Sequence, residues 1–155
     1  HNLRDYDELA AKAKSVSDRF AEIIEQQKSL EARLTENTDL KKHIINYSKT
    51  KQIYVAYRES GYSKKFFEEH RQEITLHKAA KEAFSKIKGK IPTIKELNAE
   101  YAQVLAEKKK TYSEYRKARQ EMKDYQTVKY NIDRFLQTEE QEKQAEKQKQ
   151  NTKAR

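Results

Sequence analysis

Apolar side chains recur along the chain at alternating steps of three and four residues, the spacing of a heptad seam on an α-helix. The first series begins at Leu9, reaches Leu34 and continues to Tyr54. Its phase slips near Asn37, within a segment of residues that favour helix caps, which fits either a local overwinding or a break. We expect one continuous helix over about residues 3–60, and the sequence leaves open whether it is kinked at the slip.

A second, shorter helix is expected over about residues 64–87. Gly61 suits the left-handed position that follows the end of a helix, and Ser63 is a candidate N-cap for the next one. The apolar residues of this segment cover a broad arc, in contrast to the narrow seam of the first helix. We therefore expect the second helix to pack on more than one neighbour.

A third helix is predicted over about residues 94–137. Thr93 and Glu96 have the spacing of a capping box, and thirteen positions from Ile94 to Leu136 keep the heptad alternation without a slip. These segments would form one helical hairpin domain over residues 1–137. The remaining residues, 138–155, are mainly Glu, Gln and Lys and are expected to be a frayed helix or disordered.

The predicted fold is all-α. It is a long antiparallel coiled-coil hairpin with a third, shorter helix packed at the distal tip. The two long helices are similar in length, and a chain reversal lies between them, so they should run antiparallel. In the register that we predict, Phe20 lies near Ile132, and Tyr54 lies near Leu97 or Tyr101.

The composition limits what else the chain can be. Of its 155 residues, 35% are hydrophobic and 38% are charged, which is too polar for a thick globular core. The absence of Cys excludes disulfides and Cys-based metal sites, and no apolar run is long enough to span a membrane. The chain begins at His1 without Met and already within the heptad pattern, so we expect it to be a fragment, and the sequence leaves open what precedes His1.

The net charge of +9 is unevenly distributed. Residues 38–90 carry a net charge of +7, whereas residues 1–37 carry −2. In a hairpin the middle of the sequence forms the tip, so the tip would be basic. A basic surface favours an acidic partner, such as nucleic acid or an acidic protein.

Two stretches of basic side chains are candidates for phosphate contacts, and tyrosines are interleaved with them. With Lys108 placed near residue 44, as the predicted register requires, the two stretches would merge into one band. The competing interpretation is a solvated helix surface on which Lys lies among Glu, and the sequence leaves both open. The candidate nucleic-acid-binding residues are Lys41, Lys42, Lys49, Lys51, Arg58, Lys64, Lys65, Lys108, Lys109, Lys110, Arg116, Lys117 and Arg119.

Catalytic chemistry finds no support in the sequence. The tyrosines at seam positions are expected to pack, because no activating base or metal cluster accompanies them. His70 and His77 are separated by about 10 Å along a helix, too far for one small ion. There is no phosphate loop and no nucleophile motif. We predict no metal, no cofactor and no enzymatic activity for this chain.

Two segments resemble the C-terminal region of relaxase/mobilisation nucleases from mobile elements of Gram-positive gut bacteria. Residues 43–70 read HIINYSKTKQIYVAYRESGYSKKFFEEH, and residues 91–101 read IPTIKELNAEY and lead into YSEYRKAR at 112–119. The resemblance covers about residues 35–137. The run around the SGYSKKF sequence is fairly specific, whereas the heptad parts are generic.

The resemblance implies a non-catalytic appendage that serves conjugative DNA transfer in the bacterial cytoplasm. In that family an N-terminal domain nicks single-stranded DNA with a Tyr near a metal held by histidines. No such cluster occurs in this chain, so no catalytic residue carries over. The implied partners are DNA, single-stranded or duplex, or relaxosome and coupling proteins.

Two other classes of function remain open. One is a freestanding basic coiled-coil arm that binds structured nucleic acid, like the helical hairpin of some tRNA synthetases. The other is a purely structural spacer or dimeriser, because apolar residues on a thin stem would allow a homodimer.

Overall fold

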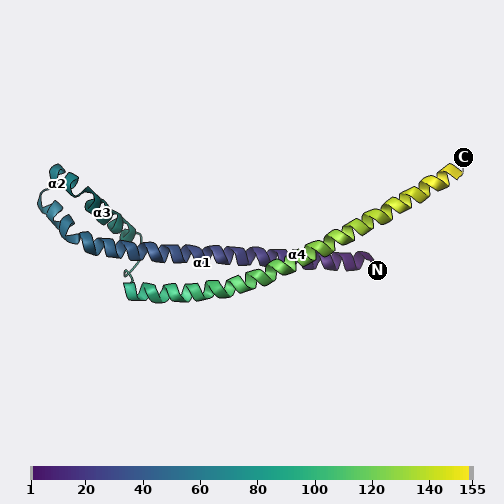
Figure 1. Cartoon of the computed structure of the whole chain (residues 1–155), viewed down its shortest axis with the longest axis horizontal. Helices are drawn as coiled ribbons and strands as arrows, with labels where there is room; N and C mark the ends of the chain where they lie inside the picture. Colours follow the sequence, from purple (N-terminus) through teal and green to yellow (C-terminus); the bar gives the residue numbers. More distant parts are fainter. Residues whose placement is uncertain (1, 154–155) are drawn as a thin grey trace. The chain divides into compact units, whose positions relative to one another are not determined.

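Residues 2–153 are built from four α-helices joined by short connections. The computed structural model describes residues 2–153, with side chains from residue 4 onward, and contains no strand over that range. The helices are α1 (Asn2–Glu59), α2 (Lys64–Glu69), α3 (Arg71–Ser85) and α4 (Ile94–Lys153), as labelled in Figure 1. They form two compact units, which we call the terminal unit (residues 1–27 and 110–155) and the turn unit (residues 28–109).

In the terminal unit α1 and α4 run antiparallel. The hydroxyl of Tyr6 donates a hydrogen bond of 2.9 Å to a carboxylate oxygen of Asp133. Fourteen residues further along α1, the ring of Phe20 stacks on Tyr115 with 5.3 Å between the ring centroids. Residue numbers that rise along α1 thus meet numbers that fall along α4, which confirms the predicted antiparallel hairpin.

The turn unit contains the rest of α1, all of α2 and α3, and the start of α4. The amide of Asn37 donates a hydrogen bond of 2.8 Å to the carbonyl of Leu97, which joins α1 to the first turn of α4. Closer to the chain reversal, His77 of α3 stacks between Tyr47 and Tyr54 of α1, at centroid distances of 4.6 and 4.4 Å. In Figure 1 α3 lies along the end of α1. This confirms the shorter helix at the turn end of the hairpin.

α1 ends in a tight left-handed turn at Gly61. Gly61 has a φ of +73°, and its N–H bonds to the carbonyl of Arg58 at 3.0 Å. The N–H of Tyr62 bonds to the carbonyl of Tyr57 at 3.1 Å. These two bonds form a Schellman motif, which satisfies carbonyls that the helix itself leaves unpaired.

The predicted N-terminal caps of α2 and α4 are also confirmed. The hydroxyl of Ser63 accepts a hydrogen bond from the N–H of Phe66 at 3.4 Å. At the start of α4 the capping box is reciprocal. The N–H of Glu96 bonds to the hydroxyl of Thr93 at 3.1 Å, and the N–H of Thr93 bonds to the carboxylate of Glu96 at 3.3 Å.

α1 is continuous through residues 35–39, where the heptad phase slips. The hydroxyl of Thr35 donates to the carbonyl of Glu31 at 3.1 Å, so this capping residue bonds back into its own helix. Asn37 is buried because its amide reaches Leu97 on α4. At the other end of the chain, residues 138–153 continue α4 as helix.

The segment expected as one helix over about residues 64–87 is two helices. His70 leaves the helical conformation, with φ −126° and ψ +31°, and lies between α2 and α3. Its N–H still bonds to Phe66, and its carbonyl still accepts from Ile74, both at 3.0 Å. The bend therefore costs little hydrogen bonding, and it lets the rings of α2 pack against the end of α1.

The predicted register of the hairpin is wrong. Phe20 stacks on Tyr115 in place of the expected Ile132, and Leu97 lies against Asn37 in place of the expected Tyr54. In both cases the actual partner is 17 positions away from the expected one. The reason is that α3 packs on the stretch of α1 that contains Tyr54, so α4 pairs with an earlier part of α1.

Buried residues are concentrated in the turn unit. In the terminal unit the buried hydrophobic residues are Ile23 and Ala118. The turn unit buries Leu30, Tyr57, Ile74, Ala80, Leu97 and Val104, together with the polar Asn37, Thr50 and His77. Because burial of apolar surface is the main stabilising term, we expect the turn unit to be the more stable of the two.

Candidate nucleic-acid interface

Six of the candidate basic residues lie on exposed positions of the turn unit, on α1 and α2. They are Lys42, Lys49, Lys51, Arg58, Lys64 and Lys65. Among the residues that the structure describes, none of the six makes an ion pair. On α1, Lys42 and Lys49 are seven residues apart, as are Lys51 and Arg58, so each pair lies on one helix face. These cations are available to an external anion.

Lys41 is held against α4. Its ammonium group donates a hydrogen bond of 3.2 Å to the side-chain carbonyl of Asn98 and lies 4.7 Å from the centre of the Tyr101 ring. These contacts keep the charge near the surface while the aliphatic stem is half-buried. Lys41 therefore serves the packing of α1 on α4 in addition to carrying positive charge.

Lys108, at the start of the second basic stretch, does not lie where the predicted register places it. The ammonium group of Lys108 lies 3.4 Å from the carboxylate of Glu31, not near residue 44 as expected. Thirteen positions of α1 correspond to about 20 Å. Lys109 is exposed in the turn unit, and the terminal unit exposes Lys110, Arg116, Lys117 and Arg119. The expected placement of Lys108 near residue 44, on which the single band depended, is therefore wrong, for the same reason as the register.

Acidic side chains neighbour the α4 stretch in the turn unit. Arg33 of α1 lies 3.9 Å from Glu100 and 3.7 Å from Glu107, and Lys108 pairs with Glu31. All of these side chains are at least about a third exposed, so each ion pair contributes little to stability. Their main effect here is to neutralise local charge, which leaves the first basic stretch as the stronger candidate.

The structure adds three cations that the sequence did not single out, all on α3. Lys81 lies 4.9 Å from the centre of the Tyr54 ring. Lys78 lies 5.8 Å from the Tyr57 ring, and Arg71 lies 5.5 Å from the Phe67 ring. The ring contacts of Lys78 and Lys81 depend on the register of α3 against α1, whereas Arg71 covers a ring of the neighbouring α2, four residues earlier in the chain.

The two units differ in charge. The turn unit carries 18 Lys and Arg against 11 Asp and Glu, a net charge of +7. The terminal unit carries 16 against 14, a net charge of +2. Most of the positive field therefore originates in the turn unit, where it would attract a polyanion.

His77 is the most deeply buried titratable side chain in the turn unit, with 2% of its surface exposed. Its Nδ1 lies 2.9 Å from the hydroxyl oxygen of Thr50. Burial between two tyrosine rings lowers the pKa of His77 below its usual value, and the nearby charge of Lys81 lowers the pKa further. A hydrogen bond with the backbone of Tyr47 opposes that shift.

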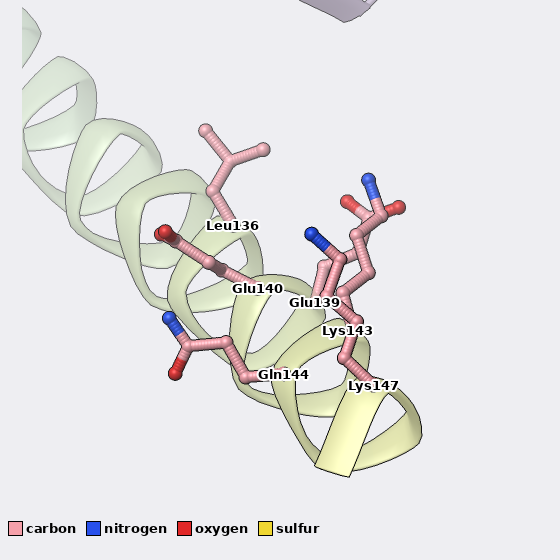
Figure 2. Close-up of a pocket in the computed structure, with 6 residues that line it drawn as sticks. All are labelled: Leu136, Glu139, Glu140, Lys143, Gln144 and Lys147. Atoms are coloured by element: carbon pink, nitrogen blue, oxygen red, sulfur yellow. The ribbon is translucent and has the colours of Figure 1, made fainter. Parts of the chain in front are cut away.

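No side chains converge on an enclosed catalytic or metal-binding site in the part of the chain that the structure describes. Over residues 2–153, no three His, Asp or Glu side chains gather as ligands for a metal ion. The hollow shown in Figure 2 is lined by six residues of α4 alone, Leu136, Glu139, Glu140, Lys143, Gln144 and Lys147, which stand along one helix. It is an open helix surface and not a pocket between elements.

None of the described helices has the length and apolarity needed to cross a membrane. Comparison with protein-family models, with curated proteins and with solved structures gives no match for this chain.

Proposed function

We propose that this chain is a non-catalytic helical arm that binds nucleic acid through its turn unit. The observation that carries the proposal is the set of six exposed cations on α1 and α2, Lys42, Lys49, Lys51, Arg58, Lys64 and Lys65, which have no acidic partner among the residues that the structure describes. Phosphate groups are the anions that such dispersed cations neutralise in series along a strand.

The resemblance of residues 35–137 to the C-terminal region of relaxase/mobilisation nucleases suggests the biological setting. A relaxase handles single-stranded DNA during conjugative transfer, and a basic appendage would retain the strand or position the transfer machinery. We therefore propose DNA as the partner. A transfer protein is the second candidate, because the uncompensated positive charge would also fit an acidic protein surface.

The test is fluorescence anisotropy of labelled single-stranded DNA, duplex DNA and folded RNA across a salt series. We expect weak, largely sequence-independent binding that falls steeply with salt, because released counterions supply most of the affinity. Preference for folded RNA would instead favour an arm for structured nucleic acid. Absence of binding at low salt would remove nucleic acid and leave a protein partner or a structural spacer.

Two matched charge variants locate the interface. Replacing Lys42, Lys49 and Lys51 by Gln should weaken binding to a single strand. It should also flatten the slope of log K against log salt concentration by about 0.7 for each lost phosphate contact. Replacing Lys143, Lys147 and Lys149 by Gln removes the same charge from exposed positions of α4. Helicity should survive both changes, because Gln is nearly as good a helix former as Lys. Equal losses in the two variants would mean that net charge alone drives binding.

A further inference from the structure

The turn between α1 and α2 holds one aromatic side chain in an unusual backbone conformation. Tyr62 has a φ of +58° and directly follows Gly61, so two consecutive residues are left-handed. For a residue with a side chain, this conformation costs about 1–2 kcal/mol, so the surrounding contacts must maintain it. The sequence alone predicted a glycine turn but not a strained tyrosine next to it.

Hydrogen bonds and a ring contact hold the backbone and the ring of Tyr62 in place. Its N–H bonds to the carbonyl of Tyr57, and its ring meets the ring of Tyr57 edge-on at 5.3 Å. The hydroxyl of Ser60 donates to the same carbonyl at 2.5 Å and accepts from the N–H of Ser63 at 3.3 Å. Hydrogen bonds thus stabilise the turn both before Tyr62, at Tyr57 and Ser60, and after it, at Ser63.

Tyr62 is nevertheless open to solvent. Its exposed fraction is 57%, whereas Tyr57 beneath it is 8% exposed. Tyr57 is in turn supported by Phe66 and Phe67 of α2, at centroid distances of 6.1 and 6.0 Å. A rigid aromatic cluster therefore presents one tyrosine at the surface, so little side-chain entropy remains to be lost when a planar ligand stacks on it.

Cations flank this exposed ring. Arg58 lies four residues before it, and Lys64 and Lys65 follow it within three residues; all three are exposed and unpaired among the described residues. Glu59 is the one acidic residue of the segment 58–65. The turn therefore combines a planar ring with a net charge of +2 over eight residues.

We propose that Tyr62 stacks on an unpaired base of single-stranded nucleic acid, while Arg58, Lys64 and Lys65 contact the adjoining phosphates. An exposed ring beside a cationic track is the arrangement that binds single strands with little sequence preference. In a duplex the base faces are already stacked, so the ring adds nothing to duplex binding. This inference rests on the proposed nucleic-acid-binding function and assigns it a specific place.

The test compares Tyr62→Asn with Tyr62→Phe in anisotropy measurements with labelled oligo-dT. Asn tolerates the left-handed conformation, so the turn should persist, and far-UV circular dichroism checks this. We expect Tyr62→Asn to lower the affinity for the single strand by about tenfold and Tyr62→Phe to preserve it. Duplex affinity should not change in either variant.

A second readout reports stacking directly. The chain contains no Trp, so Tyr62→Trp introduces a single fluorophore at the turn. Oligo-dT should quench its emission, whereas Trp in a Tyr112→Trp control should not be quenched, although Tyr112 is comparably exposed at 54%.

The two proposals fail in different ways. Single-strand binding that is unaffected by Tyr62→Asn, with no quenching at position 62, would overturn the stacking proposal and leave nucleic-acid binding intact. Absence of binding to any nucleic acid would overturn both.

Discussion

The buried His77 should make the stability of the turn unit depend on pH. The dependence should appear below the ordinary pKa of histidine, about 6.5, and extend down to the lower pKa that His77 has in the folded chain. In the unfolded chain its pKa is about 6.5. In the folded chain its pKa is lower, first because of burial and second because of Lys81. Below pH 6.5 the unfolded chain therefore binds a proton that the folded chain does not. Its contribution to stability is complete above about pH 6.5 and is lost as pH falls from there through the folded pKa.

The size of the effect follows because the unfolded chain binds at most one more proton at His77 than the folded chain does. Within that pH window the free energy of unfolding should fall by at most about 1.4 kcal/mol per pH unit. His77→Phe removes the titrating group and keeps a ring between Tyr47 and Tyr54. At neutral pH it loses the hydrogen bond to Thr50, a cost of about 1 kcal/mol, while the Thr50 hydroxyl keeps its bond of 2.6 Å to the carbonyl of Asn46.

The assay is urea unfolding, followed by far-UV circular dichroism, from about pH 7.5 to about pH 5.5, a range that spans the ordinary histidine value. The unfolding free energy of the natural chain should fall relative to that of His77→Phe as the pH decreases. A Thr50→Val control should retain the pH dependence, because burial and the charge of Lys81 lower the pKa of His77, and neither cause involves Thr50. Parallel decreases in the natural chain and in His77→Phe would refute the reasoning.

Four further substitutions test the packing and the turns. Ile23→Asp places a charge in a seam position that is 4% exposed, so it should cost about 3 kcal/mol or more and reduce hydrogen-exchange protection in the terminal unit more than in the turn unit. Equal loss in both units would contradict it. Ile132→Asp should cost less, because Ile132 is only half-buried. Gly61→Ala should cost about 1 kcal/mol in urea unfolding, since nothing lies within 4 Å of the added methyl group and only the φ of +73° opposes it. Thr93→Ala should cost about 1 kcal/mol and speed amide exchange in the first turn of α4; unchanged exchange there would mean that the capping box adds nothing.

Local features of this fold could be predicted from the sequence because a few neighbouring residues determine them. Gly61 adopts the expected left-handed conformation at the end of α1, and Thr93 with Glu96 forms the expected capping box. Each depends on hydrogen bonds between residues at most five positions apart. The helical hairpin could also be predicted, because two long heptad seams joined by a reversal have few other ways to bury their apolar faces.

The register could not be predicted in the same way. Seam positions alternate by three and four residues, so a shift of 17 residues, two heptads plus three, still leaves apolar residues facing apolar residues. The choice depends on a competition in which α3 occupies the part of α1 around Tyr54. Asn37 illustrates the difference. The phase slip at Asn37 could be seen in the sequence, whereas its buried hydrogen bond to Leu97 could not.

The candidate interface shows the same contrast between local features, which could be predicted from the sequence, and contacts between helices, which could not. Exposure of Lys42, Lys49 and Lys51 is what a polar helix face predicts, and the structure has it. The ring contacts of Lys78 and Lys81 were missed, because they depend on which residues of α1 face α3. The conformation of Tyr62 was missed as well, since tyrosine has no intrinsic preference for positive φ.

The serial placement of α3 and then α4 along α1 has a consequence for the order of folding. The bond between Thr50 and His77 closes a loop of 27 residues, that between Asn37 and Leu97 one of 60, and that between Tyr6 and Asp133 one of 127. Loop closure costs more entropy as the loop lengthens, so the hairpin should nucleate at the turn and zip toward the termini. During synthesis α3 also leaves the ribosome before α4 does. It can therefore dock on α1 before α4 can compete for that surface, and the order of synthesis favours the register that the structure has.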